Sequence, residues 1–318
     1  MKEKELLCEV ARLYYEQGLT QQDISNRLFI SRSSVSRLIK EARETGVVEI
    51  TIHYPYDRMR ILEYEFQNRF HLDDIRISDS ENMDEDEDFS AVTKMGASYV
   101  NSLLRDDMVL GVTWGKSVSA TLKELKPVNY LPRLNVVQMA GSVDASNPSI
   151  DGPDIVHSVA NKYGSKYRYI PVPLAVENKL IRDSLLNNVN VKETLQLAEN
   201  ANVMVTGIYG ISEWSSFLKK EEVKYLKDHG AVGHICGHYY DADGKLLEMP
   251  VLDDRTICAG NKIFSDILFR LGIAANPNKA TAVLAALRGG LVNALVTNTS
   301  TAYEIIRLDD ASKGKKKK

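Results

Sequence analysis

From residue 74 to residue 306 the chain alternates short apolar runs with segments of helical periodicity, which limits the folds it can adopt. The apolar runs predict strands at residues 74–78, 108–112, 134–139, 203–206, 256–259, 271–274 and 293–297. Helical spacing of apolar residues marks segments 58–70, 91–104, 118–125, 155–162, 191–199, 279–287 and 301–306. Repeated strand–helix alternation is typical of a parallel sheet with helices on both faces. The sequence therefore predicts an α/β domain.

The length of 318 residues is enough for about two domains of ordinary size. Residues 1–45 contain no proline, and the first one, Pro55, follows a β-like run at residues 47–52. These changes predict a first domain of residues 1–54 and a second of residues 55–318. Two segments are expected to lie outside regular structure: the loop 79–88, with seven acids in ten positions, and the lysine-rich end 313–318.

Three helical patterns occur in the first 45 residues. The first has one apolar face and stops at Gly18, and the second begins at Thr20-Gln21-Gln22-Asp23, close to a capping box. A tight turn at residues 29–30 leads to Ser31, which is expected to cap the third helix. The apolar stripe of that helix repeats at i, i+3, i+4 and i+7, through Val35, Leu38, Ile39 and Ala42. This pattern predicts an all-α helix-turn-helix head.

The other face of the third helix is basic. Between Arg27 and Arg43 there are five basic residues and one acid, although the formal net charge of the whole chain is −3. Arginine at the start of such a helix can bridge guanine O6 and N7, and serine and lysine can bind phosphates. The candidate DNA-binding residues are Thr20, Gln21, Arg32, Ser33, Ser34, Ser36, Arg37 and Lys40. The alternative is a plain three-helix bundle with a solvated basic face.

Three cysteines, Cys8, Cys236 and Cys258, are far apart and form no CxxC pair, which is typical of a reduced intracellular compartment. The charged N-terminus has no apolar signal region, and no long apolar run could span a membrane, so we expect a cytoplasmic protein. His234, Cys236 and His238 alternate and would share one face of a strand, but no fourth ligand is evident. We therefore expect no metal and no cofactor.

Long stretches resemble the SorC/DeoR-type sugar-responsive transcription regulators of bacteria. They are ARLYYEQGLTQQDISNRLFISRSSVSRLIKEARETGVVEI, GVTWGKSV, VVQMAG, AVGHICGHYYDADGK and NKATAVLAALRGGLVNALVTNTSTA. The resemblance covers nearly the whole chain and is weakest across the acidic stretch. It implies a Rossmann-like effector domain similar in fold to sugar-phosphate isomerases and deaminases. It also implies a repressor of a carbohydrate catabolic operon, with a phosphorylated sugar or polyol as effector and a dimer or tetramer on operator DNA.

The segment 111–117 follows an apolar strand and precedes a helix. A nucleotide P-loop needs four residues between its first glycine and the Gly-Lys pair, and this chain has three, so ATP hydrolysis is not expected. Glycine still permits close approach of a ligand, and amides at a helix N-terminus favour an anion. The effector candidates here are Gly111, Thr113, Trp114, Gly115, Lys116 and Ser117. The alternative is a structural turn between strand and helix.

Further candidates lie in other loops: Gly141 and Ser142 within 139–146, and Gly207 within 206–210. Some family members carry a Schiff-base lysine where this chain has Ala140, so we expect non-covalent binding. The family pattern implies that Asp241 binds sugar hydroxyls, although Asp-x-Asp-Gly is often a simple turn.

The family pattern also places a phosphate-facing lysine at Lys279, at the start of a helix. Two departures concern the same site. Ala274-Ala275 replaces the usual Gly-Gly, which limits how closely a ligand can approach the backbone. His234 replaces the common aspartate, so we assign it no role.

An enzyme of the sugar-phosphate isomerase or deaminase class, with an accessory DNA-binding head, is the rival interpretation. Such catalysis needs a carboxylate or histidine general base near the substrate carbons. Beyond Asp241, the strand-end loops present no such arrangement. We therefore predict a regulator without catalytic residues.

Overall fold

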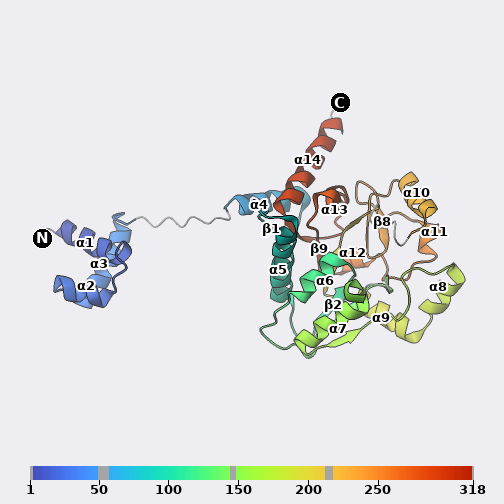
Figure 1. Cartoon of the computed structure of the whole chain (residues 1–318), viewed down its shortest axis with the longest axis horizontal. Helices are drawn as coiled ribbons and strands as arrows, with labels where there is room; N and C mark the ends of the chain where they lie inside the picture. Colours follow the sequence, from blue (N-terminus) through green and yellow to red (C-terminus); the bar gives the residue numbers. More distant parts are fainter. Residues whose placement is uncertain (1–2, 49–56, 144–147, 212–217, 317–318) are drawn as a thin grey trace. The chain divides into compact units, whose positions relative to one another are not determined.

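The computed structural model describes residues 3–48, 57–143, 148–211 and 218–316 (Figure 1). The chain divides into two compact units, Met1–Tyr56 and Asp57–Lys318, each with its own core. Most of the β-like run predicted at 47–52 lies outside the described residues, as do positions 144–147 of the loop 139–146.

The first unit consists of α1 (Glu3–Tyr15), α2 (Gln21–Leu28) and α3 (Arg32–Glu44). Thr20 and Asp23 form the predicted capping box, and Phe29 ends α2 in the left-handed conformation with φ 53°. Ser31 caps α3 by accepting a hydrogen bond from the amide of Ser34. The predicted stripe of α3 is buried against α1 and α2, where Val10, Leu13 and Ile24 are fully buried. The all-α head is confirmed.

The second unit is built around a parallel sheet. Seven strands of the described residues pair in the order β1-β10-β9-β5-β2-β3-β4, all in parallel. Their bounds are β1 (Asp74–Ser78), β2 (Val109–Val112), β3 (Asn135–Gln138), β4 (Lys166–Arg168), β5 (Val203–Gly207), β9 (Phe269–Ile273) and β10 (Ala294–Asn298). A small antiparallel sheet contains β6 (Tyr209–Gly210), β7 (Gly233–Ile235) and β8 (His238–Tyr240). The predicted α/β class is confirmed.

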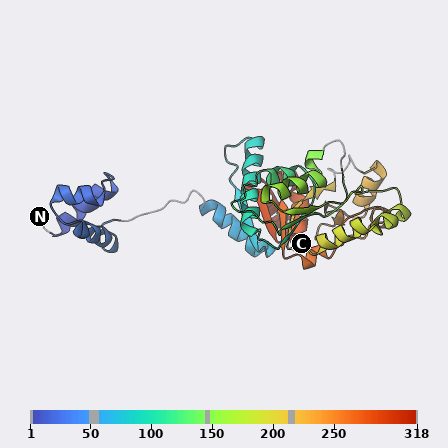
Figure 2. The ribbon, with the colours of Figure 1, turned by 90° about the horizontal axis from the view of Figure 1, so that it is seen from below.

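Helices cover both faces of the large sheet, as Figure 2 shows for α5 and α7 on one side and α4 and α9 on the other. The helices are α4 (Asp57–Phe70), α5 (Glu85–Leu103), α6 (Lys116–Lys123), α7 (Gly152–Tyr163), α8 (Lys179–Leu186), α9 (Val189–Glu199), α10 (Lys220–Asp228), α11 (Pro250–Asp253), α12 (Ile263–Asp266), α13 (Ala280–Arg288) and α14 (Thr299–Lys316). Short 3₁₀ turns occur at η1 (Pro148–Ile150) and η3 (Pro277–Lys279). Every helix predicted from periodicity is present.

Alternation of side chains along the strands explains the two core layers. Val203 and Val205 of β5 pack under α5, α6 and α7, whereas Met204 between them packs on the opposite face. Because successive side chains of a strand point to opposite faces, a strand covered on both faces reads as one continuous apolar run. The short apolar runs in the sequence carry this signal.

One predicted strand is wrong. Residues 256–259 form only isolated bridges, because their amides and carbonyls are shared between two different segments. Ile257 donates to the carbonyl of Leu174, whereas Ala259 donates to the carbonyl of Met139. A strand needs one continuous partner, and this segment has none among the described residues. The sequence reading also missed β4 and the small antiparallel sheet.

The shared strand face predicted for His234, Cys236 and His238 is also wrong. Cys236 and Gly237 both have positive φ, 51° and 85°, and they turn the chain between β7 and β8. Two such residues are typical of the tight hairpin turn whose twist matches that of its strands. His234 therefore pairs with Tyr239, and His238 pairs with Ile235, on two different strands.

The acidic loop and the C-terminal tail require corrections. Residues 85–88 of the predicted loop form the first turn of α5, which Asp84 caps with a capping box to Glu87. Carboxylates are stabilised at this position by the positive end of the helix dipole. At the other end of the chain, α14 continues to Lys316, so the helix extends into the segment expected to lack structure.

Candidate functional site

The exposed face of α3 and the start of α2 form two adjoining grooves on the first unit. One groove, of about 610 Å³, brings Thr20 and Gln21 together with Arg32. The other, of about 590 Å³, brings Gln21 together with Ser33, Ser36, Arg37 and Lys40. Both are lined by Tyr14 and Gln21, so nearly all predicted DNA-binding residues lie on one continuous surface.

Ser34 is the predicted DNA-binding residue that lines neither groove. Its hydroxyl lies 2.8 Å from the hydroxyl of Ser31, within the N-cap of α3. The grooves also contain Tyr14, Tyr15 and Arg43, which the sequence reading did not select as contacts. The rings of Tyr14 and Tyr15 meet edge to face at 5.0 Å, at the end of α1. An exposed surface with tyrosine and arginine side chains is suited to phosphate contacts.

A cavity of about 650 Å³ opens in the second unit where five parallel strands end. The cavity is lined by residues that follow β1, β2, β5, β9 and β10. It therefore lies at the edge of the sheet where open α/β sheets bind ligands. The lining residues used below are Asp84, Asp88, Phe89, Lys116, Ser117, Tyr209, Asn276, Lys279, Asn298 and Ser300. Three predicted effector residues, Lys116, Ser117 and Lys279, are thus brought to one cavity from two different loops.

Each cavity lysine lies on an aromatic ring. The Nζ of Lys116 is 4.9 Å from the centre of the Phe89 ring, and the Nζ of Lys279 is 4.9 Å from the centre of the Tyr209 ring. A cation over a ring face is attracted by the ring's quadrupole, which favours a defined position for the ammonium group. The two positive charges are therefore held at the cavity wall.

Tyr209 organises the cavity floor. Its ring stacks on His234, with centroids 4.9 Å apart, and on Trp114, with centroids 6.5 Å apart. Burial lowers the pKa of His234 well below its usual range, and the charge of Lys279 lowers it further, so the imidazole is neutral. The Tyr209 hydroxyl donates a 2.7 Å hydrogen bond to the carbonyl of Trp114.

Two predicted glycines make room for this ring rather than for a ligand. A Cβ on Gly115 would lie 1.7 Å from the Tyr209 hydroxyl oxygen, and a Cβ on Gly207 would lie 2.6 Å from it. Thr113 is buried beneath the cavity, where its hydroxyl bonds to Thr206 at 3.2 Å, and Trp114 is also buried. These predicted residues therefore lie just behind the cavity wall.

The N-terminus of α6 supplies a second attraction for anions. Gly115 is its N-cap and offers no side chain to the first amides, which have no partner inside a helix. Lys116 and Ser117 are the first two helical residues and line the cavity. Lys279 ends η3 and is the N-cap of α13, whose own cap likewise lacks a side-chain hydrogen bond. Such helix starts favour negative ligand groups.

An acidic wall lines the same cavity as these lysines, and the sequence did not predict it. It consists of Asp84, Glu85, Asp86 and Asp88, at the start of α5. Burial raises the pKa of the Asp88 carboxyl above its usual range, while hydrogen bonds from Asn298 and Ser80 lower it. Asn298, at the end of β10, donates to Asp88 through its amide group. The cavity thus combines two ammonium groups with carboxylate acceptors, and Lys116 lies beside the acidic start of α5, on the Phe89 ring of that helix.

Four more predicted effector residues, Gly111, Gly141, Ser142 and Asp241, also do not line this cavity. A Cβ on Gly111 would clash with Met139 Sδ, and one on Gly141 would clash with the backbone of Pro173, so both glycines permit close packing. The backbone of Ser142 exchanges hydrogen bonds with Val172 and Leu174. The carboxylate of Asp241 accepts bonds from the amides of Asp243 and Lys245, which forms the predicted turn.

No group of three or more histidine, cysteine, aspartate or glutamate side chains among the described residues could hold a metal ion. No described helix combines the length and the apolar character needed to cross a lipid bilayer.

Comparison with known families assigns both units. The family model described as "Putative sugar-binding domain" matches residues 54–307. The "MarR family" model matches residues 11–54. The first match covers well over half of the chain.

Full-length relatives share both parts. The sorbitol operon regulator of Klebsiella pneumoniae is 28% identical over 308 residues, which cover 95% of this chain and 98% of the relative. The transcriptional regulator LsrR of Escherichia coli strain SMS-3-5 is 30% identical over 317 residues, 96% of each chain. Both relatives are named as regulators, which favours the regulator over the rival enzyme interpretation.

Solved structures agree with these matches. The full-length SorC regulator of Klebsiella pneumoniae has a TM-score of 0.75 at 27% identity, over 96% of this chain and 99% of that one. A DeoR-family regulator of Listeria monocytogenes, at 20% identity, shares the fold with a TM-score of 0.72 over 78% of this chain and 100% of that one. The chain therefore belongs to the SorC-type transcription regulators, in which a helix-turn-helix head precedes a sugar-binding domain.

Proposed function

We propose that this protein represses a carbohydrate catabolic operon and that a phosphorylated sugar or polyol in the cavity of the second unit weakens its hold on operator DNA. The observation that carries the proposal is the placement of Lys116 and Lys279 in one cavity at the carboxyl ends of parallel strands. A sugar-binding family and relatives that regulate operons support it.

The phosphate group is proposed to lie between the two lysines. A lysine at a helix start is unfavourable for the helix dipole unless an anion is bound there. Both lysines occupy such starts, Lys116 on α6 and Lys279 before α13. A dianion between them would neutralise both ammonium groups and accept bonds from the first amides of α6.

The hydroxyl groups of the ligand are proposed to bind the polar part of the cavity wall. Ser117, Asn276, Asn298 and Ser300 bring hydroxyl and amide groups to the cavity, and Asp88 brings an acceptor. A polyol chain offers several hydroxyl donors, which suits such a wall. The proposed site leaves out Asp241, whose carboxylate is used by its own turn.

The DNA-binding surface is proposed to read one operator half-site. Arg32 and Arg37 are exposed on α3 and can reach base edges, while Ser33, Ser36 and Lys40 can hold phosphates. Two half-sites need two heads, so we propose a dimer or tetramer formed by the second unit. Sedimentation of residues 55–318 tests this part, because a monomer would contradict it.

The test of the proposal links the ligand to DNA release. In vitro selection from a random-sequence library with the full-length protein provides the specific duplex. A thermal-shift screen then compares pentose, hexose and polyol phosphates with the unphosphorylated compounds. A ligand at about 100 times its dissociation constant adds about 2.7 kcal/mol of stability.

Fluorescence anisotropy of the selected duplex gives the decisive reading. The proposal expects a phosphorylated compound that stabilises the protein and releases the duplex, while its unphosphorylated form does neither. A protein that binds the duplex but is stabilised only by unphosphorylated sugars would overturn the phosphate assignment.

A further inference from the structure

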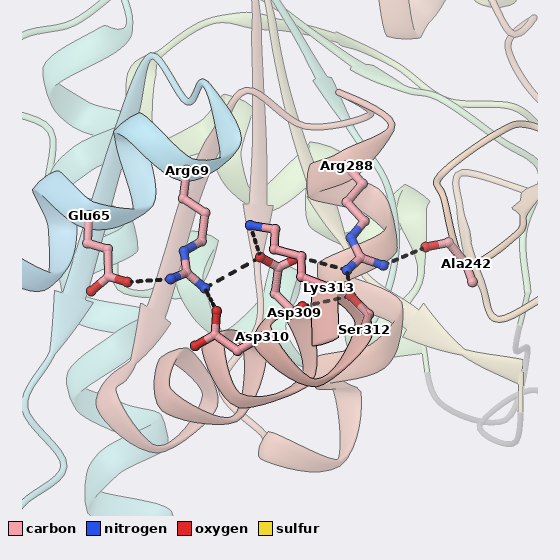
Figure 3. Close-up of polar contacts among 8 residues, drawn as sticks. All are labelled: Glu65, Arg69, Ala242, Arg288, Asp309, Asp310, Ser312 and Lys313. Carbon is pink, nitrogen blue, oxygen red and sulfur yellow. Dashed lines mark hydrogen bonds and ion pairs between the residues drawn. The ribbon is translucent and has the colours of Figure 1, made fainter. Parts of the chain in front are cut away.

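One buried carboxylate joins three helices of the second unit. The side chain of Asp309 on α14 is 3% exposed, and Figure 3 shows it between Arg69 of α4 and Arg288 of α13. Its Oδ1 accepts a 2.6 Å hydrogen bond from Arg288. Its Oδ2 lies 3.4 Å from Nη1 of Arg69 and 2.7 Å from Nζ of Lys313. The two oxygens of one carboxylate therefore hold two different helices.

The arginines are held by further contacts. Arg69 also pairs with Glu65 at 2.9 Å and with Asp310 at 2.8 Å. Arg288 also donates to the Ser312 hydroxyl at 2.5 Å and to the carbonyl of Ala242 at 3.4 Å. Both arginines are mostly buried, with 20% and 24% of their side chains exposed. The network is thus a defined structure and not a loose surface pair.

The arginine from α13 connects the network to the effector cavity. Lys279 immediately precedes α13, and Arg288 is the last residue of that helix. A helix of nine residues is about 13 Å long, so α13 spans the distance between the cavity and the network. If α13 shifts as a unit when a phosphate binds at Lys279, Arg288 at its other end shifts as well.

The arginine from α4 connects the network toward the head. α4 is the first helix after residues 49–56, the segment that covalently joins the two units. Its inner face is fixed by apolar packing of Met59, Leu62 and Phe66, and Arg69 fixes its last turn to α14. Its first turn is also tied to α14, because Arg58 donates a 3.1 Å hydrogen bond to the Tyr303 hydroxyl.

We propose that the Arg288–Asp309–Arg69 network transmits occupancy of the effector cavity from α13 to α4, and thereby to the DNA-binding head. The proposal rests on the proposed function and adds how the site is coupled to DNA binding. Charged groups that share one buried carboxylate polarise one another. A change at Arg288 therefore alters the strength of the interaction between Asp309 and Arg69. Removing one partner of a buried charge is strongly destabilising, because the remaining charge is left without compensation.

The ligand-free test is hydrogen exchange of the full-length protein. Arg288→Gln removes a charge on α13, and the Arg288 side chain has no hydrogen bond or ion pair with a described residue of α4. The proposal expects amide exchange in the last turn of α4 to rise several-fold. The matched control is Arg255→Gln, whose side chain is also 24% exposed and is paired with the buried Glu222 elsewhere in the unit. Exchange of α4 that equals wild type in Arg288→Gln would overturn the proposal.

The ligand test uses the selected duplex and glucitol 6-phosphate, a phosphorylated polyol of the proposed ligand class. Arg288→Gln and Arg69→Gln should bind the compound within about twofold of wild type. The compound should nevertheless lose most of its effect on DNA affinity, falling from the about 5–150-fold usual for allosteric coupling to about twofold. Full release of DNA in both variants would overturn the proposal.

Two provisions keep the outcomes distinct. Where a glutamine variant does not fold, Arg288→Lys keeps the charge but cannot make the same set of bonds, and the same loss of coupling is expected. A wild-type protein that does not bind glucitol 6-phosphate counts against the proposed ligand class, whereas the exchange result still decides whether α13 and α4 are coupled.

Discussion

The ammonium group of Lys279 lies 4.9 Å above the centre of the Tyr209 ring, which is itself stacked on the neutral His234. The ring cannot turn freely, because the Tyr209 hydroxyl is bonded to the carbonyl of Trp114. The aromatic column therefore places the ammonium group of Lys279 at the wall of the cavity.

Replacement of Lys279 by alanine should weaken binding of the phosphorylated effector. A charge-assisted hydrogen bond contributes about 1.5–3 kcal/mol, which corresponds to a rise in dissociation constant of roughly 10- to 150-fold. Calorimetric titration with the phosphorylated and unphosphorylated forms of one sugar measures this. The exposed Lys227 on α10 provides the control variant Lys227→Ala, for which no change is expected. An unchanged preference for the phosphorylated form in Lys279→Ala would move the phosphate to Lys116 and Ser117.

Gly115→Ala should destabilise the second unit and disturb its cavity. The backbone of Gly115, with φ 110° and ψ 166°, lies in a region that is essentially restricted to glycine, where strain costs roughly 1–3 kcal/mol. The clash of its new Cβ with Tyr209 adds an overpacking cost of about 1–3 kcal/mol. Urea unfolding followed by tryptophan fluorescence reports on this unit, since both tryptophans of the chain, Trp114 and Trp214, belong to it.

Two further variants separate backbone strain from the clash. Gly290 has φ 62°, and a Cβ there would meet open space, so Gly290→Ala should cost only about 1–2 kcal/mol. Adding Tyr209→Phe to Gly115→Ala removes the clashing hydroxyl and should restore part of the lost stability. Equal losses in Gly115→Ala and Gly290→Ala would show that the clash contributes nothing.

The sequence was sufficient for the elements that depend on local pattern. The stripe of α3, the caps at Thr20 and Ser31, and the apolar strands of the large sheet were all predicted. The failures depend on contacts between distant segments. Residues 256–259 have a strand-like composition but bond to two different partners, and the turn at Cys236–Gly237 requires positive φ that the alternating pattern conceals.

The candidate site could be predicted only in part for the same reason. Lys116 and Lys279 were found because each lies at a helix start after a strand, which is a local signal. Tyr209 was passed over because its role depends on rings from two other segments. The acidic run predicts a loop, because charge density alone does not reveal that Asp88 bonds to Asn298, 210 residues further along the chain.

Asp88 should make the stability of the second unit depend on pH. Burial raises the pKa of its carboxyl in the folded state, so the folded protein binds a proton at a higher pH than the unfolded chain does. The unfolding free energy contributed by this group therefore increases as pH falls through the raised pKa toward the unfolded value. The difference in unfolding free energy between wild type and Asp88→Asn isolates this contribution. Wild type should gain stability relative to the variant between pH 7 and about pH 4, and a constant difference would contradict the prediction.

Arg32→Ala should impair recognition of the selected duplex more than binding to a scrambled one. Arg32 is the first residue of α3, its side chain is exposed, and it lines a groove with Thr20 and Gln21. An arginine that bridges guanine O6 and N7 contributes about 1–3 kcal/mol of discrimination.

Anisotropy titrations of both duplexes at several salt concentrations measure the effect of Arg32→Ala. Arg12→Ala is the control, because Arg12 is exposed on α1, pairs with Glu9 and lines neither groove. If affinity falls for the selected duplex alone, Arg32 reads a base. If affinity falls equally for both duplexes, and the slope of log K against log salt concentration decreases by about one, Arg32 contacts a phosphate instead. Base reading would then rest with Arg37, which is five residues further along α3 and is also exposed.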